Sequence, residues 1–310
     1  MPDEIASLDQ RMRQAAFDHV RSLSATRDAL SSDDLTAGFI FEGKRYPLVN
    51  QRRGIFKPSD MQHLLSIRTV FPRPGARVWY DDQRNVHEQI YGGNDFVEYA
   101  FMGTNPDAAD NRWLRDAWQE QIPILYFIGI APGQFMANRA YIGGWDAKRL
   151  KALVGFGETL RAEAERLPDS EPARRYALRA VKQRLHQATF RQAVITAYEG
   201  RCAMSGLPEP MLLDAAHIIA DKDEGLGQPI VPNGLPMSKL HHAAFDAHLL
   251  GIAPDFRLHV SDRLLGQHDG PMLEALKQLD KRMIRLPRRT TDQPSRDRLA
   301  ARFDVFLASR

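Results

Sequence analysis

The sequence predicts an α+β protein in which a strand-rich N-terminal domain and a mixed C-terminal domain are joined by a helical segment. A length of 310 residues exceeds one typical domain and is short for three. Residues 38–145 alternate short apolar runs with Gly, Pro, Asn and Asp turns, which is typical of strands. Residues 146–188 are charged and rich in alanine, which is typical of helices. Residues 189–310 contain the polar motifs that indicate chemistry.

Composition excludes several classes of protein. The chain is 43% hydrophobic and 26% charged, as in ordinary globular proteins, so wholesale disorder is excluded. No apolar run approaches the roughly 18 residues that a membrane span requires, and the acidic start lacks the apolar segment of a signal peptide. The one cysteine, Cys202, precludes an intrachain disulfide and favours a reducing, cytoplasmic setting. The formal net charge of +3 indicates no partner until its charges are located along the chain.

Residues 1–37 are the first predicted element, a helical segment with apolar residues at helical spacing. The second element, residues 38–145, is predicted to consist mainly of strands. Its apolar runs include residues 38–41, 76–80 and 122–130, and all four tryptophans lie in or beside the region. Two of them, Trp113 and Trp118, are expected on a helix, where they would pack into the core.

Residues 146–188 are predicted to form a helical linker with a break near Pro168. The last element, the domain of residues 189–310, is expected to begin with a helix over residues 190–198 that Gly200 terminates. Positive charge concentrates late in this domain, in residues 281–289. These cations are expected to contact phosphates, with a solvated surface as the alternative.

Polar motifs lie close together in the C-terminal domain. They are Asp-Ala-Ala-His at 214–217, Asn-Gly at 233–234 and His-His-Ala-Ala-Phe-Asp at 241–246. His242 and Asp246 stand one helical turn apart, so their side chains would project side by side and could bind one divalent ion. His217 ends an apolar run that is typical of a strand, and imidazole titrates near physiological pH. Such a group could take a proton from a water that attacks a phosphodiester, while the metal neutralises the developing charge.

This arrangement resembles the HNH nucleases of the ββα-metal superfamily. The elements occur in family order, with His217 on the first strand, Asn233 after the hairpin loop and His242 on the helix. The resemblance implies that His217 is the general base and that Asn233 fixes the hairpin loop and the orientation of the base. It also implies that His242, with Asp246 one turn later, holds the metal ion. Mg²⁺ is the expected ion, with Mn²⁺, Co²⁺ or Ni²⁺ as alternatives.

The chain departs from the family pattern next to the base. Many members have a metal-binding Asp or His directly before the base, and here that position is Ala216. Asp214 is a candidate substitute ligand, although strand alternation leaves its reach open, and a hydrogen-bonding cap is its alternative role. A single His on an apolar strand is more often a core residue. The joint occurrence of four polar residues in family order is what favours a nuclease.

A second pattern indicates a lost metal site. HNH domains of this type often bind a structural zinc through two residue pairs, one before the first strand and one before the helix. The corresponding pairs here are Cys202 with Ser205 and Ser238 with His241. Because serine is a poor zinc ligand, no structural zinc is expected. Cys202 and His241 are instead expected to pack or form hydrogen bonds where a metal would lie.

The strand-rich region, residues 38–145, resembles the PUA-like superfamily, which includes the SRA and EVE readers of modified bases. The stretches 50–58, 78–82 and 110–115 are the most characteristic, and association with an HNH domain supports the resemblance. It implies a β-barrel with a pocket for a modified cytosine, such as 5-methylcytosine, flipped out of the duplex.

A flipped base requires aromatic faces for stacking and polar groups for its Watson–Crick edge. Trp79, Tyr80, Asp81 and Asp82 offer both within one segment, with barrel core and a solvated turn as the alternatives. Contacts to the DNA backbone are expected from five basic side chains, which are Arg52, Arg53, Lys57, Arg288 and Arg289.

The sequence thus predicts a modification-dependent DNA endonuclease, a restriction enzyme that reads double-stranded DNA with residues 38–145 and hydrolyses it with residues 189–310. Cutting both strands needs two active sites, so a homodimer is expected. One alternative is an HNH nuclease whose reader recognises sequence or DNA shape. Another is a non-catalytic DNA-binding protein with a decayed HNH module. RNA also stays open as a substrate, since PUA-like barrels serve RNA too.

Overall fold

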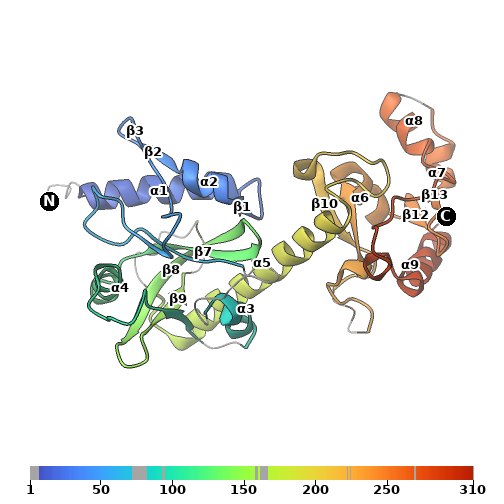
Figure 1. The fold of residues 1–310 in the computed structure, drawn as a ribbon. Helices are drawn as coiled ribbons and strands as arrows, with labels where there is room; N and C mark the ends of the chain where they lie inside the picture. Colours follow the sequence, from blue (N-terminus) through green and yellow to red (C-terminus); the bar gives the residue numbers. More distant parts are fainter. Residues whose placement is uncertain are drawn as a thin grey trace. The chain divides into compact units, whose positions relative to one another are not determined.

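The computed structural model describes residues 7–71, 82–92, 95–157, 160, 167–221, 223, 225–268 and 270–309, without the side chains of residues 82–85. The chain divides into two compact units, unit 1 (Met1–Ala188) and unit 2 (Thr189–Arg310), and each forms its own core (Figure 1). Within the described residues, no helix combines the length and the apolar character needed to cross a membrane.

Unit 1 is built around a mixed sheet that curls into a half-barrel. The strand order is β4-β5-β7-β8-β9-β6, with β1 also paired to β8, and only β5 and β7 run parallel. The strands are β1 (Leu30–Ser31), β4 (Ile55–Phe56), β5 (Ser66–Thr69), β6 (Val97–Ala100), β7 (Ile124–Ala131), β8 (Gln134–Asp146) and β9 (Lys151–Phe156). A register shift places a bulge at Gly143 in β8, and a Cβ atom there would lie 2.2 Å from Cε1 of Phe96. Such bulges bend a sheet and increase its twist.

The mixed content of helices and strands agrees with the predicted α+β class, but the closed PUA-like barrel is not seen in the described residues. Their strand order is open, with β4 at one end and β6 at the other. Part of the reason is that two helices, α3 (Asp82–Gly92) and α4 (Ala109–Gln119), occupy much of the chain between β5 and β7. Both tryptophans expected on a helix lie on α4 and pack against the core.

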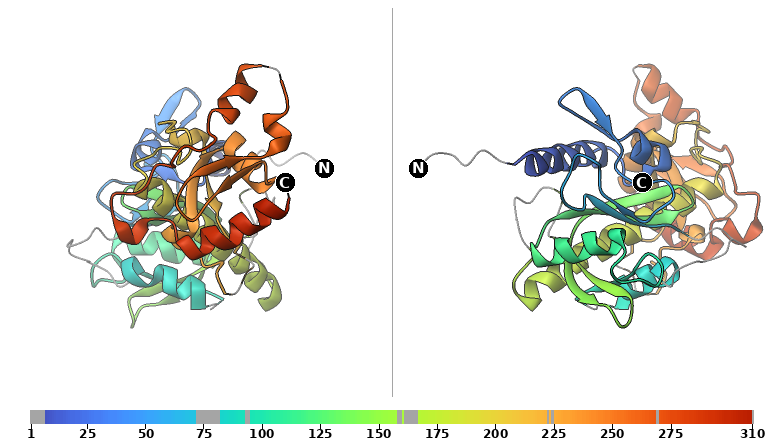
Figure 2. Two further views of the ribbon diagram at one scale, coloured as in Figure 1. Left: turned by 90° about the vertical axis from the view of Figure 1, so that its right-hand side faces the viewer. Right: turned by 60° about the vertical axis from the view of Figure 1, so that its left-hand side comes forward.

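Hydrophobic cores cover both faces of this sheet. One core lies under α1 (Leu8–Ser24) and α2 (Ser32–Ala37), so the predicted N-terminal helical segment is present (Figure 2). A capping box between Ser7 and Gln10 starts α1. The other core lies under α3, α4 and the first part of α5. A separate hairpin is formed by β2 (Phe39–Phe41) and β3 (Lys44–Tyr46).

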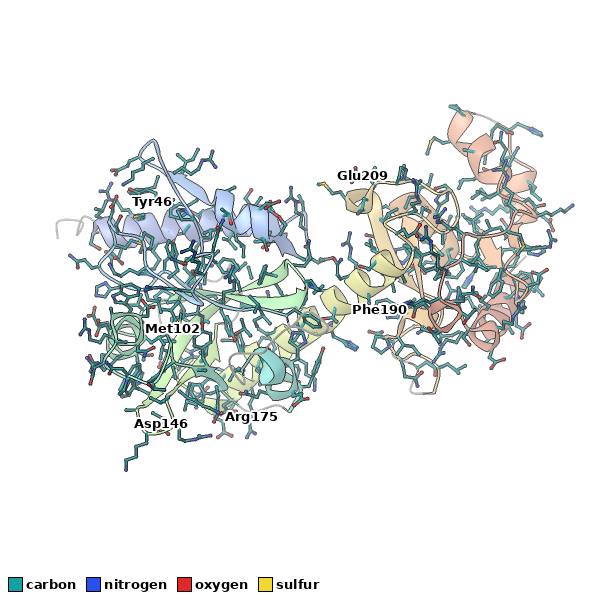
Figure 3. The ribbon with its side chains drawn as sticks, viewed as in Figure 1. Tyr46, Met102, Asp146, Arg175, Phe190 and Glu209 are labelled. Carbon is teal, nitrogen blue, oxygen red and sulfur yellow. The ribbon has the colours of Figure 1, made fainter. Side chains whose placement is uncertain are left out.

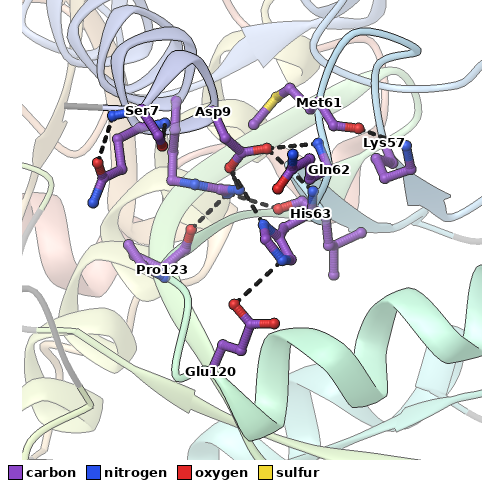
Figure 4. A network of polar contacts seen from close by, with 11 residues as sticks. Ser7, Asp9, Lys57, Met61, Gln62, His63, Glu120 and Pro123 are labelled. Atoms are coloured by element: carbon purple, nitrogen blue, oxygen red, sulfur yellow. Dashed lines mark hydrogen bonds and ion pairs between the residues drawn. The ribbon is translucent and has the colours of Figure 1, made fainter. Parts of the chain in front are cut away.

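A buried polar network fastens α1 to the sheet (Figure 4). The Arg13 guanidinium donates to the backbone carbonyls of Leu64 at 2.6 Å and Pro123 at 2.9 Å. It also pairs with Asp9 at 2.9 Å, and Asp9 accepts the backbone N–H of Gln62 at 2.8 Å. Burial raises the pKa of Asp9, but the Arg13 charge and these hydrogen bonds outweigh it, so the pKa lies below its usual value. The charged pair is therefore satisfied despite its burial.

The stretch from Asp146 to Phe156 differs from the helical linker predicted for residues 146–188. Strand β9 lies in this stretch and pairs with both β8 and β6, so it belongs to the sheet. The charged residues that suggested a helix form the turn before β9, where the Asp146 carboxylate accepts the backbone N–H groups of Lys148 and Arg149. The helix itself, α5 (Glu171–Ala197), begins only after this strand.

Unit 2 contains two short hairpins and the helices packed on them. The final turns of α5 correspond to the helix predicted over residues 190–198. The elements that follow are β10 (Leu213–His217), β11 (Gly234–Ser238), α6 (Lys239–Asp246), β12 (Leu250–Ile252), β13 (Leu258–Val260), α7 (Asp262–Leu265), α8 (Pro271–Lys277) and α9 (Arg296–Ala308). Helix α9 packs against β12 (Figure 2, left), and one core that includes Tyr198, Phe245 and Leu299 joins these elements. The β10-β11-α6 order is the ββα succession that the resemblance implies.

Candidate active site

The predicted active-site residues lie on the β10–β11 hairpin and on α6. The two strands pair in antiparallel register, with Asp214 opposite Met237 and His217 opposite Gly234. His217 therefore lies at the loop end of the hairpin, where the long connection to β11 begins. Helix α6 follows β11 without a gap, because Ser238 ends the strand and also caps the helix by accepting the backbone N–H of His241 at 3.3 Å.

Asn233 is fully buried and braces the loop of this hairpin. Its Oδ1 accepts the backbone N–H of Ile219 at 3.0 Å, and its Nδ2 donates to the carbonyl oxygens of Ile219 at 2.9 Å and Gln228 at 3.0 Å. The backbone carbonyl of Asn233 accepts the N–H of Ile218 at 2.9 Å. One side chain thus holds both ends of the loop next to His217, and a buried amide with these partners is costly to replace.

Three residues form what we call the acidic cluster: Asp214, His242 and Asp246. His242 Nδ1 lies 3.4 Å from Asp214 Oδ2, and His242 Nε2 lies 3.3 Å from Asp246 Oδ2. The side chains are 39%, 28% and 61% exposed for Asp214, His242 and Asp246, so water and a divalent ion can reach them. Asp214 does reach the helix, although it is not next to His217 in the sequence.

The donor set of the acidic cluster suits a divalent ion of the Mg²⁺ or Mn²⁺ type, because it offers carboxylate oxygens and one imidazole. The two carboxylates, however, lie at opposite nitrogens of the His242 ring. One ring nitrogen can bind a metal while the other donates to an orienting carboxylate. This explains why, within the described part of the chain, no three His, Cys, Asp or Glu side chains form a preassembled metal site.

Arg302 on α9 is a residue of this region that sequence reasoning missed. Its Nη2 donates to the backbone carbonyl of Phe245 at 3.1 Å and to Asp246 Oδ1 at 3.4 Å. Its guanidinium also lies over the Phe245 ring, 4.7 Å from the ring centre. The two oxygens of the Asp246 carboxylate therefore face different partners, Oδ2 toward His242 and Oδ1 toward Arg302. No local spacing could have indicated this contact, because 56 positions separate Arg302 from Asp246.

The four residues predicted at a lost zinc site do converge, and we call them the thiol cluster: Cys202, Ser205, Ser238 and His241. His241 Nδ1 lies 3.5 Å from Cys202 Sγ and 2.8 Å from Ser238 Oγ, and the Ser205 backbone N–H donates to Cys202 Sγ at 3.5 Å. Burial raises the pKa of the Cys202 thiol, but the hydrogen bonds from His241 and Ser205 outweigh it and lower the pKa to about 6. Cys202 and His241 are thus hydrogen-bonded to each other, as expected.

The residues proposed for a modified-base pocket cannot be placed. Trp79, Tyr80 and Asp81 lie outside the described residues, and so does the side chain of Asp82, the first residue of α3.

The basic residues proposed for DNA contacts fall into two groups. Three have partners: Arg53 pairs with Asp110 at 3.1 Å, Lys57 donates to the Met61 carbonyl at 2.6 Å (Figure 4), and Arg288 pairs with Glu199 at 2.7 Å. Lys57 is also partly buried and lies over the Trp113 ring. Arg52 and Arg289 form the second group; their side chains are exposed, as are those of Arg53 and Arg288. Exposed cations can bind phosphates at less cost than those already engaged.

Comparison with known proteins bears on unit 2. Residues 202–253 match the model of the HNH endonuclease family. Among solved structures, a "Modification dependent TagI restriction endonuclease" is similar at 13% identity and a TM-score of 0.29, over 82% of this chain and 85% of that chain. A TM-score of this size does not establish a common fold. A search of curated proteins gives no match. The family match spans the β10–β11 hairpin, α6 and both polar clusters, and it shows that the chain has an HNH endonuclease domain.

Proposed function

Because residues 202–253 form an HNH endonuclease domain, we propose that this nuclease is a modification-dependent DNA endonuclease that hydrolyses phosphodiester bonds with one divalent ion. The observation that carries the catalytic part is the ββα arrangement, in which a braced hairpin presents His217 and α6 presents His242 and Asp246. The reading part is supported by the resemblance of residues 38–145 to PUA-like readers and by the curled sheet of unit 1.

In this proposal His217 is the general base. Its imidazole would take the proton of the water that attacks the scissile phosphate. Asn233 would keep the loop, and with it the end of β10, in one conformation through its hydrogen bonds to backbone groups. A base held in place in this way needs little reorganisation before proton transfer, which is where preorganisation lowers a barrier.

His242 Nε2 and Asp246 would hold the ion, which supplies charge neutralisation at the phosphate when bound. Asp214 would accept the N–H of His242 Nδ1 and so fix the ring orientation and tautomer, although it remains a candidate ligand itself. Arg302 would support Asp246 from the other side by donating to its free oxygen. Mg²⁺ is the proposed ion, with Mn²⁺, Co²⁺ or Ni²⁺ as substitutes.

Unit 1 would read the DNA. Trp79, Tyr80, Asp81 and Asp82 are proposed to stack on a flipped cytosine and bind its polar edge. The exposed Arg52, with Arg289 of unit 2, is proposed to contact the DNA backbone. Cleavage of both strands would require a homodimer or a transient pairing of two copies on DNA.

The test uses one duplex in three forms, with cytosine, 5-methylcytosine or 5-hydroxymethylcytosine. We expect Mg²⁺-dependent cleavage of at least one modified form and no cleavage of the unmodified form. The matched control is His217→Ala, which should lose cleavage and retain DNA binding in an electrophoretic shift. Equal cutting of all three duplexes would instead indicate a reader of sequence or shape. Cutting confined to an RNA hairpin would contradict a DNA substrate.

A further inference from the structure

Phe190 lies near the end of α5 (Figure 3), and its ring lies face to face with that of His217. The two ring centres are 4.1 Å apart and the ring planes differ by 12°. Phe190 is buried and His217 is partly buried, so one face of the imidazole is covered by the phenyl ring. We propose that Phe190 is a positioning residue for the general base, a role that rests on the function proposed above for His217.

The Phe190 ring is itself held in place by the hairpin. Gly234 is the register partner of His217 on β11. A Cβ atom at Gly234 would lie 2.8 Å from Cζ of Phe190 and 2.3 Å from Cγ2 of Val194, one helical turn later. Glycine is therefore required there because α5 packs directly on the backbone opposite the base. Phe190 thus contacts both strands of the hairpin, His217 on β10 and Gly234 on β11.

The stack supplies a restraint that the hydrogen bonds of Asn233 do not. Those bonds fix the backbone of the loop, whereas the outer torsion of a histidine side chain is broad and has no single strongly preferred value. A ring packed parallel to the imidazole restricts that torsion and so fixes the direction in which the ring nitrogens point. Offset stacking of two aromatic rings is favourable beyond the burial of their surface.

A purely structural role for Phe190 makes different predictions. A core residue can be replaced by another apolar side chain of similar volume at a modest cost in stability, with the activity of the folded enzyme unchanged. A positioning residue needs a flat ring, so its loss lowers kcat in enzyme that is still folded and still binds DNA. Misplacement of a reacting group by about 1 Å can cost roughly 10²-fold in rate.

The main experiment compares Phe190→Leu with the full-length wild type on a duplex containing 5-methylcytosine. We expect kcat to fall by roughly 10- to 100-fold while KM and the Kd for DNA stay within about twofold, in line with a misplaced base. Ile195→Ala is the matched control, because Ile195 lies on the same helix as Phe190 and its side chain is also buried. That variant should be less stable but retain the wild-type kcat.

A second measurement needs no activity. In the wild type, the imidazole proton signals of His217 should carry the upfield NMR shift that a parallel phenyl ring causes, and Phe190→Leu should remove it. The signals are assigned by their absence in His217→Ala. If Phe190→Leu does not fold, Phe190→Met takes its place in both measurements.

The outcomes separate the two proposals. Full cleavage by His217→Ala would overturn the role of His217 and this inference with it. An inactive His217→Ala together with a wild-type kcat for Phe190→Leu would leave the base in place and overturn only the role of Phe190. An unshifted His217 signal in the wild type would likewise overturn the stack.

Discussion

His241 and His242 are neighbours on α6 but belong to different polar clusters. His241 is buried in the thiol cluster against Cys202 and Ser238, whereas His242 is partly exposed in the acidic cluster between Asp214 and Asp246. Consecutive helical residues point about 100° apart. One helix therefore contributes a histidine to the buried thiol cluster and another to the solvent-exposed acidic cluster.

The difference between the clusters lies in their partners. Two of the four residues in the thiol cluster are serines, and the cluster closes on itself through hydrogen bonds. The acidic cluster has carboxylate oxygens that face solvent, as a catalytic ion and its substrate would require. The same ββα scaffold therefore carries one site that contributes stability and one proposed to carry the chemistry.

Replacing each histidine by alanine tests whether the two clusters have separate roles. His242→Ala should lower kcat by at least about 10³-fold, because a bound ion contributes several kcal/mol of transition-state stabilisation. His241→Ala should leave kcat near the wild-type value but lower the free energy of unfolding by about 1–3 kcal/mol, since it leaves buried partners unsatisfied. Cleavage kinetics and urea unfolding of both variants measure the two effects. Similar kinetic losses in both would show that the clusters are not independent.

The thiol cluster can be tested by restoring a ligand set. The double variant Ser205→Cys, Ser238→Cys would combine with Cys202 and His241 into the three-thiolate, one-imidazole set of structural zinc sites. We expect it to bind one Zn²⁺ and to gain about 2.7 kcal/mol of stability when free zinc is 100 times the Kd. Elemental analysis and thermal unfolding with and without chelator provide the readout. Each single variant is a control, and a double variant that binds no zinc would argue that the four side chains do not converge.

Within the acidic cluster, the two carboxylates are proposed to have different roles. Asp246→Asn should weaken Mn²⁺ binding more than Asp214→Asn, because Asp246 is proposed as a ligand and Asp214 as the group that orients His242. Loss of an orienting carboxylate typically costs about 10- to 100-fold in metal affinity. Calorimetric titration of the full-length variants with Mn²⁺ measures this directly. An equal or larger loss in Asp214→Asn would assign Asp214 to the metal instead.

Sequence reasoning worked where chemistry is encoded locally. The His242–Asp246 pair depends on one helical turn, and the hairpin that carries His217 and Asn233 follows from an apolar run, a loop and an Asn-Gly pair. All of these lie within the segment that matches the HNH endonuclease family. The convergence of Cys202 with His241 was implied by the resemblance to HNH domains, which bind a structural zinc at the corresponding positions.

It failed where distant segments meet. Arg302 on α9 and Phe190 on α5 reach the active-site region from outside the matched segment, and no periodicity links them to it. Strand β9 was hidden because charged turn residues precede it and resemble the start of a helix. Whether the strands of unit 1 close into a barrel depends on which strands pair across the whole unit. Short apolar runs predict the strands but not their pairing.

The ionisation of Cys202 should make the stability of the protein depend on pH. Its pKa is lowered to about 6 in the folded protein from an ordinary value of 9.0, so the folded state binds fewer protons than the unfolded state between these values. The resulting stability is fully present above the unfolded pKa and is lost as the pH falls toward and through 6. The slope cannot exceed about 1.4 kcal/mol per pH unit, the limit for one proton.

Cys202→Ser removes this titration, so the stability advantage of the wild type over the variant should grow as the pH rises from 6 to 9. Urea unfolding at several pH values within that window measures it. Met204→Leu, a neighbouring change in the same core, should keep the wild-type slope. If Cys202→Ser keeps that slope too, the Cys202–His241 contact holds a neutral thiol, and the thiol cluster differs from the acidic cluster in charge as well as in exposure.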